Sequence, residues 1–427
     1  MAWLDHVNAN RPDSQPAGAQ MLSVLSNPTF RACYLAQVAS LVGAGVATVA
    51  LGLMAFELVG SAAGAVLGTA LALKTLTTVG FSSFITATLE RFPRRRVLVG
   101  LELMRGAVML TFPFVTEIWQ IYLLIVLLHT ASAGLVPSLR ATIPDILPDE
   151  RDYTRALALT QLSYDMETVA SPLLALLLLS LVPLDGLFIA AVAGFLVSAA
   201  LIASVSLPAQ NPAAGFGVRA RAVKGLRLYL GTPMLRGLLA LTFCAATASA
   251  MVLVNTVVLV QSEFGLEPQA TVLALTVFGV GSMMAAGLTP SLLDRFPERV
   301  VMVAGACLCA GGLTAGAAVD GYATMLPLWF VLGSGYALIL TPGGKLVARA
   351  AVSSDRSVLF AAQFALGHAC WFVAYLTAGM AGATAGIVFT FLILAAMAVG
   401  GLLLGARIWP VDRTALAAAV GADRRER

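Results

Sequence analysis

The sequence has 427 residues, of which 59% are hydrophobic and only 11% are charged. Soluble globular proteins carry about 25% charged residues, so this composition excludes a water-soluble chain of two or three domains. So much apolar surface requires hydrocarbon as its solvent. We therefore predict an all-α protein that is embedded in a lipid bilayer.

Twelve segments of the sequence are long and apolar enough to cross a bilayer, which takes about 20 residues of helix. Apolar runs such as residues 173–181 do not alternate with polar residues, as the strands of a membrane barrel do. We predict transmembrane helices at residues 33–57, 62–88, 97–116, 119–142, 156–181, 184–206, 234–260, 268–290, 300–318, 324–343, 357–382 and 385–406.

The distribution of basic residues predicts how these helices are oriented. The predicted helices contain only Lys74, Arg105, Arg140 and Arg236, and every other Lys or Arg lies in a terminal tail or an even-numbered connection. Basic loops stay on the cytoplasmic side, so we expect both termini inside a multi-pass protein of the bacterial plasma (inner) membrane. The net charge of +4 then belongs to the inner membrane face and does not indicate a nucleic-acid partner.

The second half of the chain repeats the first at a shift of about 204 residues. Leu89-Glu90-Arg91-Phe92-Pro93-Arg94-Arg95 follows the second predicted helix, and Leu293-Asp294-Arg295-Phe296-Pro297-Glu298-Arg299 follows the eighth. Two more matches occur in the same order, Pro137 and Arg140 with Pro342 and Lys345, and Gln161 with Gln363. We expect two pseudo-symmetric six-helix bundles at 30–206 and 234–406, a cytoplasmic linker at 207–233, and cytoplasmic tails at 1–29 and 407–427.

The linker becomes basic and amphipathic after its first residues. Its charges are Arg219, Arg221, Lys224 and Arg227. Such a pattern predicts a short helix that lies on anionic lipid headgroups, with a regulatory site as the alternative.

A six-helix half, a basic linker and a second half resemble the major facilitator superfamily over nearly the whole chain. The superfamily carries Gly-x-x-x-Asp-Arg-x-Gly-Arg-Arg after its second helix. Four residues match this motif in role: Glu90, Arg91, Arg94 and Arg95. Thr86 and Pro93 stand at the two glycine positions. The resemblance implies a cytoplasmic gate in which the acidic residue meets the start of the eleventh helix, with Asp294 and Arg295 acting similarly in the second half.

Within the superfamily, the chain looks most like bacterial exporters of the macrolide-efflux, siderophore-export and nickel-resistance kind. The shared stretches are Asn27-Pro-Thr-Phe-Arg31, Glu102-Leu-Met-Arg105, Val136-Pro-Ser-Leu-Arg140 and Gly225-Leu-Arg-Leu-Tyr229. Ser171-Pro-Leu-Leu-Ala175 replaces the glycine-rich motif of the exporters' fifth helix, and the arginine motif that many proton antiporters carry in the fourth helix is missing. Proton coupling therefore cannot be assigned to that arginine.

Ionisable side chains in the membrane are costly unless they are paired or face a cavity, so they are candidates for function. Five lie near the middle of predicted helices and are assigned to a substrate or proton pathway: Lys74, His129, Asp165, Glu167 and His368. The alternative is a buried ion-pair network, in which His129 only hydrogen-bonds a neighbouring backbone group. Glu102 and Arg105 are three residues apart on one helix face, so we interpret them as a structural pair.

The leading hypothesis is a monomeric secondary active transporter that exports a small drug-like or siderophore-like solute by alternating access, with protons as the coupling ion. A divalent metal exporter of the same fold is the alternative, because two histidines and two carboxylates are suitable ligand types. An intramembrane enzyme is a remote alternative, since no His-Glu-x-x-His or phosphate-binding motif occurs, as is a non-transporting receptor. We expect no catalytic residue, cofactor or resident metal.

The charge distribution makes a direct prediction about topology. Reporter proteins fused after Glu117, Asp185 or Asp320 should be periplasmic, and fusions after Arg95 or Arg299 should be cytoplasmic, because basic loops resist translocation. Paired phosphatase and fluorescent-protein fusions measure this. A cytoplasmic reading after Asp185 would contradict the twelve-helix topology.

Overall fold

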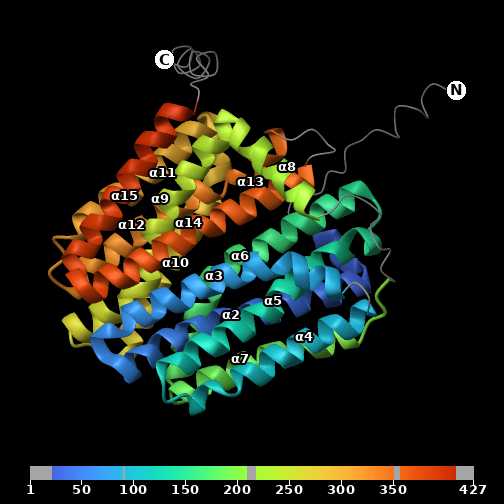
Figure 1. Ribbon diagram of the computed structural model, residues 1–427, viewed down its shortest axis with the longest axis horizontal. Coiled ribbons are helices and arrows are strands. Elements are labelled where there is room, and N and C mark those ends of the chain that lie inside the picture. The colour runs from blue at the N-terminus through green and yellow to red at the C-terminus, as the bar shows by residue number, and fades with distance from the viewer. Residues whose placement is uncertain (1–21, 90–91, 209–217, 351–355, 410–427) are drawn as a thin grey trace, which may run out of the picture.

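The computed structural model describes residues 22–89, 92–208, 218–350 and 356–409. Within these ranges the chain is helical and contains no strand (Figure 1). The long helices are α2 (Pro28–Val59), α3 (Ala63–Leu89), α4 (Arg94–Met109), α5 (Ile118–Ile146), α6 (Glu150–Leu179), α7 (Leu184–Ala203), α9 (Pro233–Val257), α10 (Pro268–Arg295), α11 (Glu298–Gly316), α12 (Tyr322–Leu340), α14 (Arg356–Ala385) and α15 (Ile387–Ile408). Two shorter helices are α8 (Val218–Gly231) and α13 (Gly343–Ala350).

Local sequence signals explain where several helices begin and end. Asn27 caps α2, because its side-chain oxygen accepts from the backbone N–H groups of Thr29 at 3.0 Å and Phe30 at 3.1 Å. Gly60, with φ of 56°, separates α2 from α3, and Gly386, with φ of 83°, separates α14 from α15. Glycine adopts this left-handed conformation without the penalty of a β-carbon, so the chain can reverse direction in a few residues.

Ten segments of the described ranges are long and apolar enough to cross a membrane. One of these segments, Pro28–Phe81, contains both α2 and α3, and the apolar part of α6, Ala170–Leu179, is shorter than a full span. The predicted all-helical membrane protein is confirmed, while the number of twelve spans stays a prediction.

Several helices extend beyond the residues predicted from hydropathy. Helix α5 continues to Ile146 and α6 begins at Glu150, and the short helix α13 after α12 had not been predicted. These additions carry polar and charged residues, so a search for apolar segments ends before them. The predicted tails lie mostly outside the described residues, as do Glu90, Arg91 and residues 209–217 of the linker.

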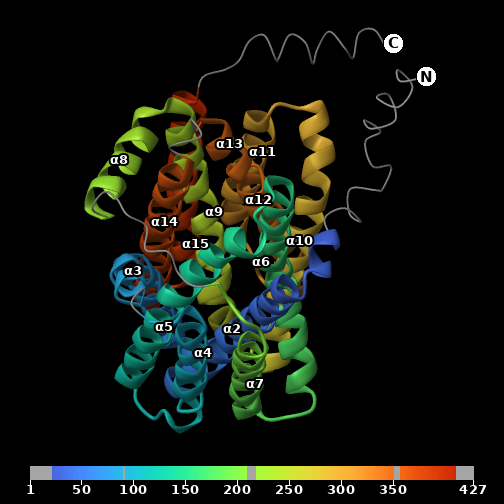
Figure 2. The same ribbon diagram turned by 90° about the vertical axis from the view of Figure 1, so that its right-hand side faces the viewer.

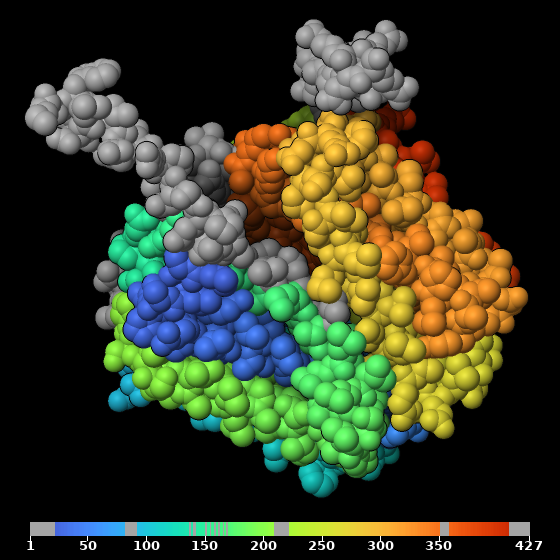
Figure 3. All heavy atoms as spheres, turned by 180° about the vertical axis from the view of Figure 1, so that it is seen from behind, coloured from blue at the N-terminus to red at the C-terminus, as the bar shows by residue number. Residues whose placement is uncertain are grey.

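The helices form two groups that follow the order of the chain (Figures 1 and 2). Helices α2 to α7 pack mainly against one another, and so do α9 to α15, while α3 meets α14 and α6 meets α10 between the groups. The helix axes of the two groups diverge toward the side that carries α8 and α13, and approach each other on the opposite side (Figure 1). Figure 3 shows the same two groups from behind, with α2, in blue, in the first group and α10, in gold, in the second.

Glycines allow the two groups to meet backbone to backbone where α3 crosses α14. A β-carbon at Gly68 would lie 2.5 Å from the Tyr375 carbonyl oxygen, and one at Gly379 would lie 2.7 Å from the Gly64 carbonyl oxygen. Asn255 of α9 adds a polar contact there, since its Nδ2 donates to the Ala378 carbonyl at 3.2 Å. Small residues permit such close packing, which provides attraction in a solvent as apolar as the side chains themselves.

Candidate functional site

Four of the five predicted pathway residues come from four different helices and are half-buried. They are Lys74 on α3, His129 on α5, Glu167 on α6 and His368 on α14. Helix α6 also carries Asp165, whose side chain lies outside the described residues. The charge of Lys74 acts on Glu167, His129 and His368, so the structure brings these residues into one electrostatic neighbourhood.

Glu167 lies where α6 crosses α2. A β-carbon at Gly45 of α2 would collide with the Ser171 side chain and lie 3.2 Å from Glu167 Oε1, so glycine is required here mainly because of Ser171. One turn further along α6, the buried hydroxyl of Ser171 has no hydrogen-bond partner among the described atoms. The crossing is therefore polar on both sides of Gly45, although it lies between two apolar helices.

His368 belongs to α14, the helix that meets the other group of helices. Its Nδ1 is 2.8 Å from the Phe364 carbonyl oxygen, which can only accept, so Nδ1 carries a proton. The imidazole also packs against the rings of Phe364 and Trp371, with centroids 4.0 and 6.2 Å apart. The other ring nitrogen, Nε2, is left to gain or lose a proton.

Glu102 and Arg105 form a buried ion pair that connects three helices. Arg105 Nη1 is 2.9 Å from Glu102 Oε2 and also donates to Ser40 Oγ of α2. Ser198 Oγ of α7 donates to Glu102 Oε1 at 2.7 Å, and the guanidinium lies 4.1 Å from the ring centroid of Phe195. Both carboxylate oxygens are bonded and the cation lies over an aromatic face, while Arg105 Nε is buried without a partner among the described atoms.

The predicted gating loops lie on the side where the two groups diverge. Arg94 forms an ion pair of 2.6 Å with Asp145 at the end of α5, while Arg95, Asp294 and Arg295 are exposed. Their partners were not predicted, because a pairing between distant segments leaves no mark in local sequence.

The second gating loop has ion pairs of its own. Glu298 lies 3.1 Å from Arg349 and 3.6 Å from Lys345, and Arg299 donates to the Ala406 carbonyl at the end of α15. The acidic residue Glu298 thus takes the place in the second half that the basic Arg94 takes in the first.

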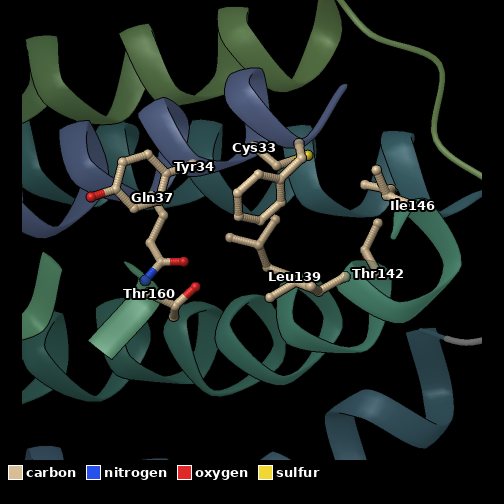
Figure 4. A pocket seen from close by; sticks show the side chains of 9 residues that line it. Cys33, Tyr34, Gln37, Leu139, Thr142, Ile146 and Thr160 are labelled. Carbon is tan, nitrogen blue, oxygen red and sulfur yellow. The ribbon is translucent and has the colours of Figure 1, made fainter. Parts of the chain in front are cut away.

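A narrow pocket between α2, α5 and α6 has room for about one water molecule (Figure 4). Gln37 and Thr160 extend polar groups into it, and Gln37 Nε2 donates to Ser163 Oγ at 3.3 Å. This pocket is too small for an organic solute. Among the described residues there is also no group of three or more His, Cys, Asp and Glu side chains that could hold a metal ion.

The fold and this membrane-embedded polar cluster define a transport protein, and comparison with known proteins shows its family. The Major Facilitator Superfamily model matches residues 33–290 and 238–426, so the chain belongs to this superfamily and is a transporter, not an enzyme. The uncharacterized MFS-type transporter YfiS of Bacillus subtilis (strain 168) is 21% identical over 281 residues, which cover 60% of this chain and 64% of that protein. The match thus spans less than two thirds of the relative.

Solved transporter structures share the fold at low sequence identity. The D-xylose-proton symporter is 16% identical, with a TM-score of 0.68 over 89% of this chain and 97% of that one. The nucleoside transporter NupG is 13% identical, with a TM-score of 0.68 over 90% and 100% of the two chains. An auto inhibited POT family peptide transporter is 13% identical, with a TM-score of 0.69 over 90% and 97%.

The pair of Glu102 and Arg105 is predicted to stabilise the fold. Glu102→Leu or Arg105→Met alone should lower the free energy of unfolding by about 3–5 kcal/mol, because each leaves an unpaired buried charge. The double variant should be close to wild type, since an apolar pair of similar volume replaces the ion pair. Thermal unfolding in detergent measures this effect.

Asp152 and Arg155 provide the matched control, because they have the same spacing and a 3.0 Å ion pair, but their side chains are 39% and 30% exposed. Asp152→Asn should change stability by about 1 kcal/mol or less. Equal losses from the single and double variants of the buried pair would contradict a role as a structural pair.

Proposed function

We propose that this protein is a secondary active transporter that exports a small organic solute by alternating access and is driven by protons. The observation that carries the proposal is the cluster centred on Lys74, whose members come from both groups of helices, with Lys74 on α3 and His368 on α14, two helices that pack against each other. A transporter of this kind needs a polar site near the bilayer midplane between two bodies that move relative to each other.

The proposal includes twelve spans in two pseudo-symmetric bundles, in a bacterial inner membrane with both termini inside. Separation of α2 from α3 at Gly60, and the 30-residue length of α6, support this number. The residue ranges 30–206 and 234–406 for the bundles agree with the grouping of α2 to α7 and α9 to α15. With this orientation, the side on which the two groups of helices diverge faces the cytoplasm, where an exporter takes up its solute.

Charge balance in the cluster suggests how protons couple to the solute. The positive charge of Arg105 is matched by its own partner Glu102, which leaves Glu167 as the described carboxylate that acts on Lys74. Lys74 forms no ion pair within 4.0 Å among the described residues, so its balance with Glu167 acts at longer range. Protonation of a carboxylate changes this balance, and a solute or a conformational change can restore it.

An organic solute is favoured over a divalent metal ion. His129 and His368, two of the possible metal ligands, lie on helices of different groups. The aromatic rings of Phe364 and Trp371 beside His368 offer contact surface to an organic molecule instead. The resemblance to macrolide and siderophore exporters supports this class of substrate.

The coupling proposal predicts a specific loss of function. Asp165→Asn, Glu167→Gln and His368→Asn should each abolish gradient-driven export while downhill exchange of solute continues, because the carrier remains but cannot exchange its proton. Lys74→Ala should shift the pH dependence of export, because it removes a positive charge that acts on Glu167 and His368. Export per folded molecule from inverted vesicles, measured against pH across panels of drugs, siderophores and metals, tests both points.

Glu263→Gln serves as the control, because Glu263 is an exposed carboxylate outside the cluster. It should export like wild type. Identical pH profiles for wild type and all three neutral variants would exclude a proton site and leave the cluster as a buried ion-pair network.

A further inference from the structure

Helix α8 touches the rest of the protein along a single narrow stripe. Among its described side chains only Gly225 and Tyr229 are buried, and both face α14 (Figure 2). A β-carbon at Gly225 would lie 2.5 Å from the Val358 carbonyl oxygen, so the two backbones are in direct contact. The hydroxyl of Tyr229 donates to Gln363 Oε1, and burial raises the pKa of this phenol, so it remains a donor.

A second stripe of α8 is apolar and exposed. Successive residues of a helix are rotated by about 100°, which places Val223, Leu226 and Leu230 within an arc of about 60° beside the buried stripe. Their side chains are 49%, 42% and 42% exposed. Lys224 and Arg227 follow on the next part of the helix circumference, so α8 presents a protein face, an apolar face and a basic face.

The position of α8 identifies what covers the apolar face. Helix α8 ends at Gly231 and α9, which is long and apolar enough to cross the membrane, begins at Pro233. Its exposed apolar stripe therefore lies where the chain enters the bilayer, and its basic residues suit anionic headgroups. The sequence adds Arg219 and Arg221 to the same helix.

We propose that α8 is a binding site for anionic lipid and that it transmits lipid binding to α14. A lipid-anchored α8 holds the start of α14 through Val358 and Gln363, and α14 carries His368 and meets α3. Anionic lipid therefore favours the arrangement seen in this structure, in which the two groups of helices diverge on the α8 side. The coupling to transport rests on the proposed function, but lipid binding by α8 does not.

Lipid contact is tested with the full chain in phosphatidylcholine vesicles, with or without phosphatidylglycerol. The five native cysteines are replaced, and a fluorophore is attached at Leu226→Cys or, as the matched control on the other side of the buried stripe, at Leu228→Cys. Brominated lipid should quench the Leu226 probe more than the Leu228 probe, and more strongly with phosphatidylglycerol. Stronger quenching of the Leu226 probe by aqueous iodide than by lipid would overturn the proposal.

Transmission to α14 is tested with Arg227→Gln, which weakens lipid binding, and Tyr229→Phe, which removes only the hydrogen bond to Gln363. The readout is the distance between spin labels at Gly100→Cys in α4 and Gly344→Cys in α13, two exposed sites with no neighbour close to a β-carbon. Phosphatidylglycerol should lengthen this distance in the wild-type background and in neither variant. An unchanged lipid response in both variants would refute the coupling, even if the probe at Leu226 confirms lipid contact.

An independent observation concerns the ion pairs of the gating loops. Arg94 and Asp145 are 51 residues apart, and so are Glu298 and Arg349. The internal shift of 204 residues relates position 94 to 298 and position 145 to 349. The two pairs are thus equivalent in the repeat, but their charges are reversed.

Reversed charges matter because equivalent positions face each other when two pseudo-symmetric halves close. Identical pairs would bring like charges together, whereas here Asp145 would meet Arg349. These two members are the exposed ones, with side chains 41% and 54% exposed, while Arg94 and Glu298 are 9% and 16% exposed. From this geometry we infer that closure on the α8 side pairs Asp145 with Arg349 between the halves.

Exchange of charges within one half separates this inference from a local structural role. Arg94→Asp with Asp145→Arg keeps an ion pair in the first half, but it makes both halves alike and places a cation opposite Arg349. The distance between labels at Gly100→Cys and Gly344→Cys should therefore shift toward the open form, with unchanged thermal stability. Adding Glu298→Arg and Arg349→Glu restores opposite charges and should restore the wild-type distance distribution.

Two outcomes contradict the inference. The first is a double variant with the wild-type distribution, and the second is a fourfold variant that stays as open as the double variant. The wild-type protein provides a separate test of alternating access. A wild-type distance distribution with a single open form under every gradient and pH would contradict alternating access. That result would refute the proposed function and would not by itself bear on the charge reversal.

Discussion

The contact between α3 and α14 at Gly68 and Gly379 is the constraint on which the arrangement of the molecule depends. No side chain separates the two backbones there, so the distance between the groups of helices is fixed at this point by direct backbone packing. Lys74 lies six residues, or about 9 Å, along α3 from this contact. His368 lies eleven residues, or about 16 Å, along α14, and both lie on the side where the helices diverge. A change in the crossing angle therefore moves these residues apart without breaking the glycine contact.

The buried charges divide into a fixed pair and an adjustable set. Glu102 and Arg105 have direct partners on α2 and α7, which holds three helices of one group in place. Lys74 and Glu167 come from different helices and act on each other without a direct bond among the described atoms. A directly bonded ion pair has to break before its helices can move apart. A longer-range interaction between two charges changes gradually when a proton or a solute arrives. The difference in contacts is consistent with the proposed roles, in which Glu102 and Arg105 stabilise the fold and Lys74 and Glu167 respond to protons or solute.

Hydropathy and the repeat were sufficient to predict the helices, the family and the closeness of Glu102 to Arg105, because each depends on local composition or on spacing along one helix. Contacts between distant segments were not predictable in the same way. The contact of Gly68 with Gly379 depends on how α3 and α14 cross, which no local pattern of residues indicates. The repeat does contain a signal for the reversed ion pairs, since positions 145 and 349 are equivalent and oppositely charged. That signal lies in a difference between the halves, whereas the repeat was identified from their similarities.

The two ends of the molecule are held together by different kinds of force. On the side away from α8, glycine backbones and Asn255 provide packing and a hydrogen bond, which depend little on the medium. On the α8 side, the exposed members of the ion pairs and the basic face of α8 contribute interactions that salt, pH and lipid charge all modify. A transporter that alternates between two openings responds to the difference between these contributions. In the proposed transport cycle, salt, pH and lipid charge can therefore shift the balance between the two openings through the contacts on the α8 side.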